Sequence, residues 1–238
     1  MATKKVNGVD AVLKRIQAEK IRWIDLQFVD VVGGLQHITI PSTSIGPDEF
    51  KRGVGKLDGS SIRGFKEIHE SDMVMRPDPA TFAVLPWYDG EHRTARMIVD
   101  VYEGGTYERF TRDSRYVAQK AVQFAKDSGY DMTYWGPEIE FFVFDGIRLT
   151  PTPDHVRNPW SGAGYEILSR EAPWHDNGGK NFPVRFKEGY YPAPPVDSLQ
   201  DFRNEACRVL IDHFGMTLDA HHHEVATAGQ CEIDMRYT

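Results

Sequence analysis

Apolar and polar residues follow patterns along the chain that predict short helices and strands. Apolar residues recur at helical spacing over 9–20 and 113–126, and over a third stretch that begins at Ser198 and ends at Gly215. Ser198 opens a Ser-Leu-Gln-Asp sequence that resembles a capping box. The glycine pair at 33–34 predicts a hairpin. Alternation rich in β-branched residues predicts strands at 22–29, 35–40, 81–85, 94–102, 132–144, 217–225 and 231–238.

These elements predict an α+β fold in two parts. The first hundred residues have the pattern of a small sheet with one or two helices, and we place the domains at 1–108 and 109–238. The segment 146–195 contains eight of the 14 prolines, so it is predicted to be a long functional loop without regular elements. The last predicted strand is still running at Thr238, from which we expect the natural chain to continue.

Composition narrows the function classes. With 40% apolar and 26% charged residues, the 238-residue chain has the composition of a folded protein. The net charge is -7 and basic residues form no run, so nucleic acid is excluded as the main partner. The two cysteines favour a reducing cytoplasm over a disulfide framework. The sequence contains neither a secretory signal nor an apolar run long enough for a membrane span, so no membrane contact is expected.

Two glutamates lie two residues apart in an aromatic, strand-like stretch. Glu138 and Glu140 project from one face of the predicted strand, while Ile139 and Phe141 project from the other. Their repulsion is about 2 to 3 kcal/mol at an effective dielectric constant near 20. A bound cation removes this repulsion, whereas a solvated sheet face merely screens it, and both interpretations stay open. Carboxylate oxygens suit hard cations such as magnesium or manganese.

A second acidic group is carried by His221-His-His-Glu-Val-Ala-Thr-Ala-Gly-Gln-Cys-Glu232. Alternation places His222 and Glu224 on one face, and His221 and His223 on the other, so a zinc site from three consecutive histidines is geometrically poor. A strand, turn and strand can bring Glu232 back beside Glu224. With the two glutamates of the earlier strand this makes a cluster of carboxylates, which requires bound cations at neutral pH.

Four motifs together resemble the prokaryotic type I class of glutamine synthetases. They are LDGSSIRGF at 57–65, PEIEFFVF at 137–144, GYYPAPPVD at 189–197 and HHHEVATAGQCEID at 221–234. The resemblance implies an N-terminal β-grasp-like domain, followed by the first half of a catalytic domain with a mostly antiparallel sheet. It also implies a homo-oligomer, a dodecamer of two six-membered rings.

The resemblance also implies roles for single residues. Glu140, Glu224 and Glu232 would bind the metal nearest the substrate glutamate. Glu138 would bind a second metal, which neutralises the nucleotide phosphates.

In the ammonium site that the resemblance implies, Asp58 takes a proton from ammonium, with Ser61 beside it. Tyr190 closes that site together with Glu224. The loop with Asp58 would reach a neighbouring subunit's catalytic domain. Asp219 is implied near the nucleotide ribose, and Tyr237 beside the nucleotide.

The implied reaction is ATP-dependent ligation of ammonium to L-glutamate through a γ-glutamyl phosphate, with two or more Mg²⁺ or Mn²⁺ ions, which serves glutamine biosynthesis and nitrogen assimilation. Members of the family are about twice as long, and their second half supplies a metal-binding histidine, arginines and a gating loop. We therefore expect these residues alone to be inactive. The alternatives are a γ-glutamyl-amine ligase that accepts methylamine or putrescine, a non-catalytic truncated gene product and, least favoured, a zinc hydrolase.

Overall fold

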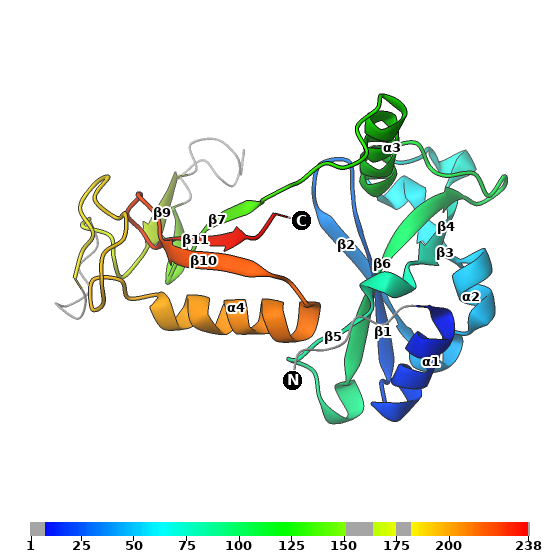
Figure 1. The fold of residues 1–238 in the computed structure, drawn as a ribbon, viewed down its shortest axis with the longest axis horizontal. Helices are drawn as coiled ribbons and strands as arrows, with labels where there is room; N and C mark the ends of the chain where they lie inside the picture. Colours follow the sequence, from blue (N-terminus) through cyan, green and yellow to red (C-terminus); the bar gives the residue numbers. More distant parts are fainter. Residues whose placement is uncertain (1–7, 151–163, 175–181, 238) are drawn as a thin grey trace. The chain divides into compact units, whose positions relative to one another are not determined.

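The computed structural model describes residues 8–150, 164–174 and 182–237, and it contains two compact units (Figure 1). The first unit comprises Met1–Thr133 with His213–Gly215, and the second comprises Tyr134–Asp212 with Met216–Thr238. This division into compact units does not test the predicted domain boundary after residue 108, which stays a prediction. Within the described residues, no helix combines the length and the apolar character that crossing a membrane requires.

The first unit is built on a mixed sheet with the strand order β2-β1-β6-β4-β3, and β5 pairs with β6 beside this path. The predicted hairpin is confirmed, with Trp23 opposite Pro41. β1 and β6 pair in parallel, and every other pair in this sheet is antiparallel. The strands are β1 (Trp23–Val29), β2 (Leu35–Pro41), β3 (Val54–Asp58), β4 (Asp72–Pro77), β5 (Ala83–Val84) and β6 (Thr94–Glu103).

Two helices share the hydrophobic core with this sheet. α1 (Val9–Ala18) buries Val12 and Ile16, and α2 (Pro47–Arg52) buries Phe50, in one cluster with Leu26 of β1 and Met97 of β6. Full burial of side chains of this size stabilises a fold by about 1.5 to 3 kcal/mol each. Short 3₁₀ turns lie at Ser42–Ser44, Gly59–Ser61, Ile68–Glu70, Pro79–Thr81 and Gly90–His92.

The helix α3 (Ser114–Asp127) begins at a buried aspartate. Asp113 Oδ1 accepts a hydrogen bond from the backbone N–H of Arg115, at 3.0 Å, and so caps the helix. Asp113 Oδ2 accepts from the backbone N–H of Val101 in β6 and from the guanidinium of Arg109, both at 3.1 Å. One carboxylate therefore joins the helix start to the sheet.

The second unit contains a three-stranded sheet with the order β10-β11-β7, in which both pairs are antiparallel. One helix packs against it, with the rings of Phe202 and Phe141 6.2 Å apart. β8 and β9 form a separate two-stranded sheet. The elements are β7 (Glu138–Phe142), β8 (Gly146–Thr150), β9 (Gly164–Leu168), α4 (Gln200–Phe214), β10 (Leu218–His223) and β11 (Gln230–Met235).

Three expectations for this unit need correction. The segment 146–195, predicted to be a loop, contains the strands β8 and β9. The stretches 146–150 and 164–168 contain no proline, and their apolar residues alternate with other residues as in a strand. Residues 151–163 and 175–181 of the predicted loop lie outside the described residues. The strand predicted from 132 begins only at Glu138, directly after Pro137. The strand predicted to run to residue 238 ends at Met235, and Thr238 lies outside the described residues.

The predicted capping box at Ser198 is also wrong. α4 begins at Gln200, two residues later, and the Ser198 hydroxyl donates to Glu171 Oε1 at 2.8 Å instead. The charged carboxylate is a strong acceptor for this hydroxyl, and it holds Ser198 just before the helix rather than at the capping position.

We expect Asp113→Ala to lower the free energy of unfolding by about 2 kcal/mol, because the substitution removes the helix cap and leaves the Val101 N–H without its acceptor. Urea unfolding followed by circular dichroism measures this change. Asp131→Ala, at an exposed position of the same unit, is the control and leaves stability within about 0.5 kcal/mol. Equal midpoints for the two variants would contradict this role of Asp113.

Candidate metal site

The two faces of the β10-β11-β7 sheet carry different side chains. His223, Cys231 and Phe141 lie opposite one another in register, and Cys231 and Phe141 contact Arg203 and Phe202 of α4. This face is covered by the helix. The next positions along each strand project from the other face, because side chains alternate.

Acidic residues form two rows on that other face. His222, Glu232 and Glu140 are direct neighbours in one row across β10, β11 and β7. Asp234 lies opposite Glu138 in the next row. The structure therefore places Glu138 and Glu140 on one face, as the alternation predicted, and the turn between β10 and β11 returns Glu232 to the same face, where His222 and Asp234 also lie.

Among the residues that the structure describes, potential ligand atoms form two groups that share Glu232, and Glu140 belongs to neither group. Potential ligand atoms of His222, Glu224 and Glu232 lie within 4.8 Å of one another, and so do those of Glu138, Glu232 and Asp234. His222 Nε2 lies 3.5 Å from Glu232 Oε2 and 3.7 Å from Asp234 Oδ2. The carboxylate oxygens of the two groups match the donors that magnesium and manganese take.

Glu232 is the buried member of both groups, with 6% of its surface exposed. Burial, together with the hydrogen bond and the charge of Asp234, raises the pKa of Glu232 to about 7, against the opposing effect of His222. Proton uptake is one way to relieve the repulsion between these carboxylates, and cation binding is the other. The residues present therefore fit a divalent cation.

The turn between β10 and β11 fixes Glu140 and the end of β10. Gln230 Nε2 donates to Glu140 Oε2 at 2.7 Å, and Gln230 Oε1 accepts from the backbone N–H of Ala226 at 2.8 Å. The Glu224 N–H donates to the Gln230 carbonyl at 3.0 Å. One glutamine thus links a carboxylate of β7 to the turn that carries Glu224.

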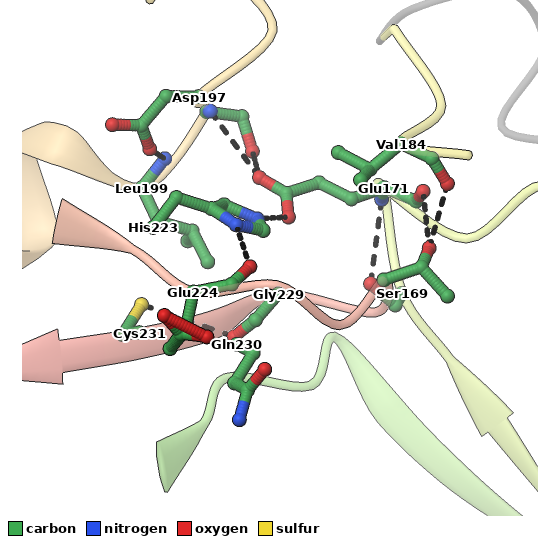
Figure 2. A network of polar contacts seen from close by, with 12 residues as sticks. Ser169, Glu171, Val184, Asp197, Leu199, His223, Glu224, Gly229, Gln230 and Cys231 are labelled. Atoms are coloured by element: carbon green, nitrogen blue, oxygen red, sulfur yellow. Dashed lines mark hydrogen bonds and ion pairs between the residues drawn. The ribbon is translucent and has the colours of Figure 1, made fainter. Parts of the chain in front are cut away.

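Beneath the carboxylate face, His223 and Glu171 form a fully buried pair (Figure 2). His223 Nε2 lies 2.6 Å from Glu171 Oε2, and His223 Nδ1 lies 2.7 Å from the carbonyl oxygen of Glu224. Burial disfavours charge on both groups, but their mutual hydrogen bond and attraction outweigh it. The pKa of His223 is raised and the pKa of Glu171 is lowered.

Two tyrosines contact the imidazole of the site. The rings of Tyr190 and Tyr191 stack with their centroids 4.0 Å apart, and Tyr191 meets the His222 ring edge-on at 4.5 Å. The hydrogen bond with Tyr191, followed by burial and the negative charges of Glu224 and Glu232, raises the pKa of Tyr190 to about 12. Tyr190 therefore stays a neutral hydroxyl beside the carboxylates at physiological pH.

Asp58 and Ser61 lie in the first unit, at the 3₁₀ turn that follows β3. Asp58 Oδ1 accepts from the N–H and the hydroxyl of Ser60, at 2.9 and 2.7 Å, and Oδ2 accepts from the Ser61 hydroxyl at 3.3 Å. These hydrogen bonds, led by the Ser60 hydroxyl, lower the pKa of Asp58. Asp58 is therefore an exposed anion with its carboxylate held by the turn.

Asp219 and Tyr237 lie near the same end of the second unit's sheet. Asp219 Oδ1 accepts from Arg236 Nε at 2.8 Å, on the exposed surface. The Tyr237 ring meets Tyr134 edge-on at 5.9 Å, and its Cβ lies 3.3 Å from where a side chain on Gly136 would begin.

Comparison with known proteins identifies the family of the chain. The family model of the glutamine synthetase β-grasp domain matches residues 20–104, and that of the glutamine synthetase catalytic domain matches residues 111–238. The chain belongs to the glutamine synthetase family. The α+β fold predicted from the resemblance, a β-grasp domain followed by the first part of the catalytic domain, is confirmed.

Curated glutamine synthetases match almost the whole chain. Identity is 51% to the protein of Sulfolobus acidocaldarius, covering 95% of this chain and 46% of the relative. It is 43% to that of Aquifex aeolicus, covering 96% and 47%, and 38% to that of Escherichia coli K12, covering 97% and 48%. The chain spans about half the length of the curated relatives that it matches.

Solved structures share the fold. Glutamine synthetase of Plasmodium falciparum superposes with a TM-score of 0.81 at 19% identity, covering all of this chain and 46% of that one. A structure of GmaS in complex with ADP gives a TM-score of 0.69 at 20% identity, covering 95% and 44%.

Several residues of the site were missed from the sequence. Asp234 follows Glu232 at the same spacing that identified Glu138 and Glu140, so the alternation could have found it. Glu171 lies in the segment that was predicted to be a loop, and no sequence pattern relates it to His223.

The metal-free chain should lose stability as the pH rises through about 7. In the folded state Glu232 has a pKa of about 7, against an ordinary value of 4.5. Its protonated form therefore contributes fully to the stability of the fold below pH 4.5, and this contribution is lost as the pH rises through 7. Glu232→Gln removes this dependence. We expect the variant to gain stability relative to the unchanged chain between pH 5.5 and 8, in urea unfolding with a chelator present. A difference that does not vary with pH would contradict the raised pKa.

Gly189 permits a close approach to the turn that carries Glu224. A Cβ on Gly189 would lie 2.6 Å from the Glu224 carbonyl oxygen and 2.9 Å from that of Ala226. We expect Gly189→Ala to lower the free energy of unfolding by about 1 to 3 kcal/mol, because backbone must shift. Gly164→Ala is the control, since its Cβ would meet open space. Urea unfolding that gives the same midpoint for both would rule out the constraint.

Proposed function

We propose that this chain forms the first half of a glutamine synthetase active site, which joins ammonium to the γ-carboxylate of L-glutamate with ATP, through γ-glutamyl phosphate. The observation that carries the proposal is the face of β10-β11-β7, where two groups of carboxylates share the buried Glu232. Membership of the glutamine synthetase family supports it. The reaction serves glutamine biosynthesis and nitrogen assimilation.

In this proposal the carboxylate face holds two divalent cations, Mg²⁺ or Mn²⁺. Glu140, Glu224 and Glu232 hold one, and Glu138 is a ligand of the other. Bound there, the cations offset the repulsion between carboxylate and triphosphate and stabilise charge during phosphoryl transfer. The distances among His222, Glu224 and Glu232, and among Glu138, Glu232 and Asp234, support two neighbouring cation positions, and Glu140 is assigned from the resemblance alone. Burial, together with the hydrogen bond and charge of Asp234, raises the pKa of Glu232, and a bound cation would offset this effect.

Asp58 is proposed to take a proton from ammonium, since ammonium has no lone pair with which to attack the γ-glutamyl phosphate. The lowered pKa of Asp58 supports its role as an anion that attracts a small cation, and Ser61 holds its carboxylate. Tyr190, neutral at physiological pH, is proposed to close the ammonium site with Glu224. Asp219 and Tyr237 are proposed to contact the ribose and the base of ATP.

The remaining proposals concern the whole protein. A cytoplasmic homo-oligomer, a dodecamer of two hexameric rings, is proposed from the resemblance alone. We also propose that the 238 residues by themselves do not complete a turnover, because the curated relatives are about twice as long.

Manganese binding tests the metal centre directly. We expect Glu232→Gln to weaken Mn²⁺ binding at least tenfold at pH 7.5, because it removes a ligand common to both groups. Affinity should also rise from pH 6 to 8, since binding displaces the proton from Glu232. Electron paramagnetic resonance of free Mn²⁺ measures both effects. Glu166→Gln, at an exposed position paired with Arg148, is the control. Equal affinity in the two variants would refute the centre.

The reaction is tested in a chimera that joins these 238 residues to the remaining part of the Sulfolobus acidocaldarius relative. We expect ATP-dependent formation of glutamine from ammonium, and none by the 238 residues alone. Asp58→Asn should lower kcat/KM for ammonium about 100-fold or more in the chimera, as expected for loss of a general base. Full turnover of the variant at low ammonium would exclude Asp58 as the base. A preference for methylamine or putrescine would identify a γ-glutamyl-amine ligase instead.

A further inference from the structure

Glu171 is a buried carboxylate to which the proposed reaction gives no task. Its side chain and that of its partner His223 are both fully buried. An ion pair at such a position is a poor source of stability, because the loss of hydration offsets the attraction between the charges. The contacts of Glu171 therefore need another explanation.

All three oxygen atoms of Glu171 have partners from other segments of the chain, while its N–H donates to the nearby Ser169 hydroxyl at 3.3 Å. Oε1 accepts from the N–H and hydroxyl of Ser198, at 3.2 and 2.8 Å, just before α4. Oε2 faces His223 at the end of β10. The Glu171 carbonyl accepts from the Val184 N–H at 2.9 Å and from the Thr227 hydroxyl at 3.3 Å. The residue thus joins the start of α4, the end of β10 and the turn before β11 (Figure 2).

The contact through His223 leads directly to the metal site. His223 bonds Glu171 through one ring nitrogen and the Glu224 carbonyl through the other. Gly189 lies against both partners of this contact, since a Cβ there would lie 2.6 Å from the Glu224 carbonyl oxygen and 3.0 Å from Cε1 of the His223 ring. The Glu224 carbonyl is therefore bonded to the imidazole and closely packed by the segment at Gly189, and the Glu224 carboxylate lies with His222 and Glu232.

We propose that Glu171 is a positioning residue of the metal centre, which acts through His223 to fix the backbone of Glu224 and so the place of the Glu224 carboxylate. This inference rests on the proposed function, because it presupposes that Glu224 is a ligand. Partners that orient ligands in this way typically contribute a factor of about 10 to 100 in metal affinity. The second group, Glu138 with Glu232 and Asp234, has no contact of this kind among the described residues.

The test is Mn²⁺ binding by Glu171→Gln. A glutamine has one acceptor oxygen in place of two, so either Ser198 or His223 loses its acceptor. We expect Mn²⁺ binding at the Glu224 site to weaken about tenfold. Glu166→Gln is the matched control and leaves the affinity unchanged.

A double-mutant cycle separates positioning from a general loss of structure. We expect Glu171→Gln to have little further effect in a Glu224→Gln background, and its full effect to be additive with that of Glu138→Gln. Additive losses in both backgrounds, or unchanged affinity in a folded Glu171→Gln, would overturn the proposal.

If Glu171→Gln does not fold, Ser198→Ala provides the same test. This substitution removes only the hydroxyl that donates a hydrogen bond to Glu171 Oε1. We expect it to weaken Mn²⁺ binding at the Glu224 site by less than Glu171→Gln does. Unchanged affinity in this variant would also overturn the proposal. Failure of the unmodified chain to bind Mn²⁺ would instead refute the metal centre of the proposed function, and the positioning role with it.

Discussion

The repulsion between like charges on one face of a small sheet is the constraint on which the second unit depends. The register of β7, β11 and β10 sets Glu140 opposite Glu232 and Glu138 opposite Asp234. No arrangement of an isolated sheet would hold these side chains together without compensation. The helix on the opposite face, the turn between β10 and β11, and the buried network below the turn hold the strands in this register.

The compensation is distributed unevenly. Gln230 supplies a neutral donor to Glu140, and His222 lies beside Glu232 and Asp234. Neither removes the excess negative charge, and burial together with the hydrogen bond and charge of Asp234 raises the pKa of Glu232 to about 7. Below the face, by contrast, Glu171 and His223 compensate each other fully. The charge of Glu171 is thus neutralised within the protein by His223, whereas the carboxylates around Glu232 keep an excess negative charge that suits a bound cation.

The carboxylate face could be predicted from the sequence because it depends on a local rule. Alternation along single strands placed Glu138 and Glu140 together, and it separated His222 and Glu224 from His221 and His223. The burial of Glu232 depends on packing between segments far apart in the chain, and so does the partnership of Glu171 with His223. Ser198 shows the limit of local patterns, since its hydroxyl serves a distant carboxylate and not the adjacent helix.

The membership of Glu232 in both acidic groups restricts how this surface can diverge. A substitution of Glu232 alters the ligand atoms of both groups at once. Evolution therefore cannot change one group and preserve the other by substituting this residue. In the proposed metal centre, a change of ion selectivity that affects one group alone requires a residue that belongs to that group only. Such residues are His222 and Glu224 on one side, and Glu138 and Asp234 on the other. Because Glu232 belongs to both groups, changes at these four residues can accumulate only while Glu232 itself is retained.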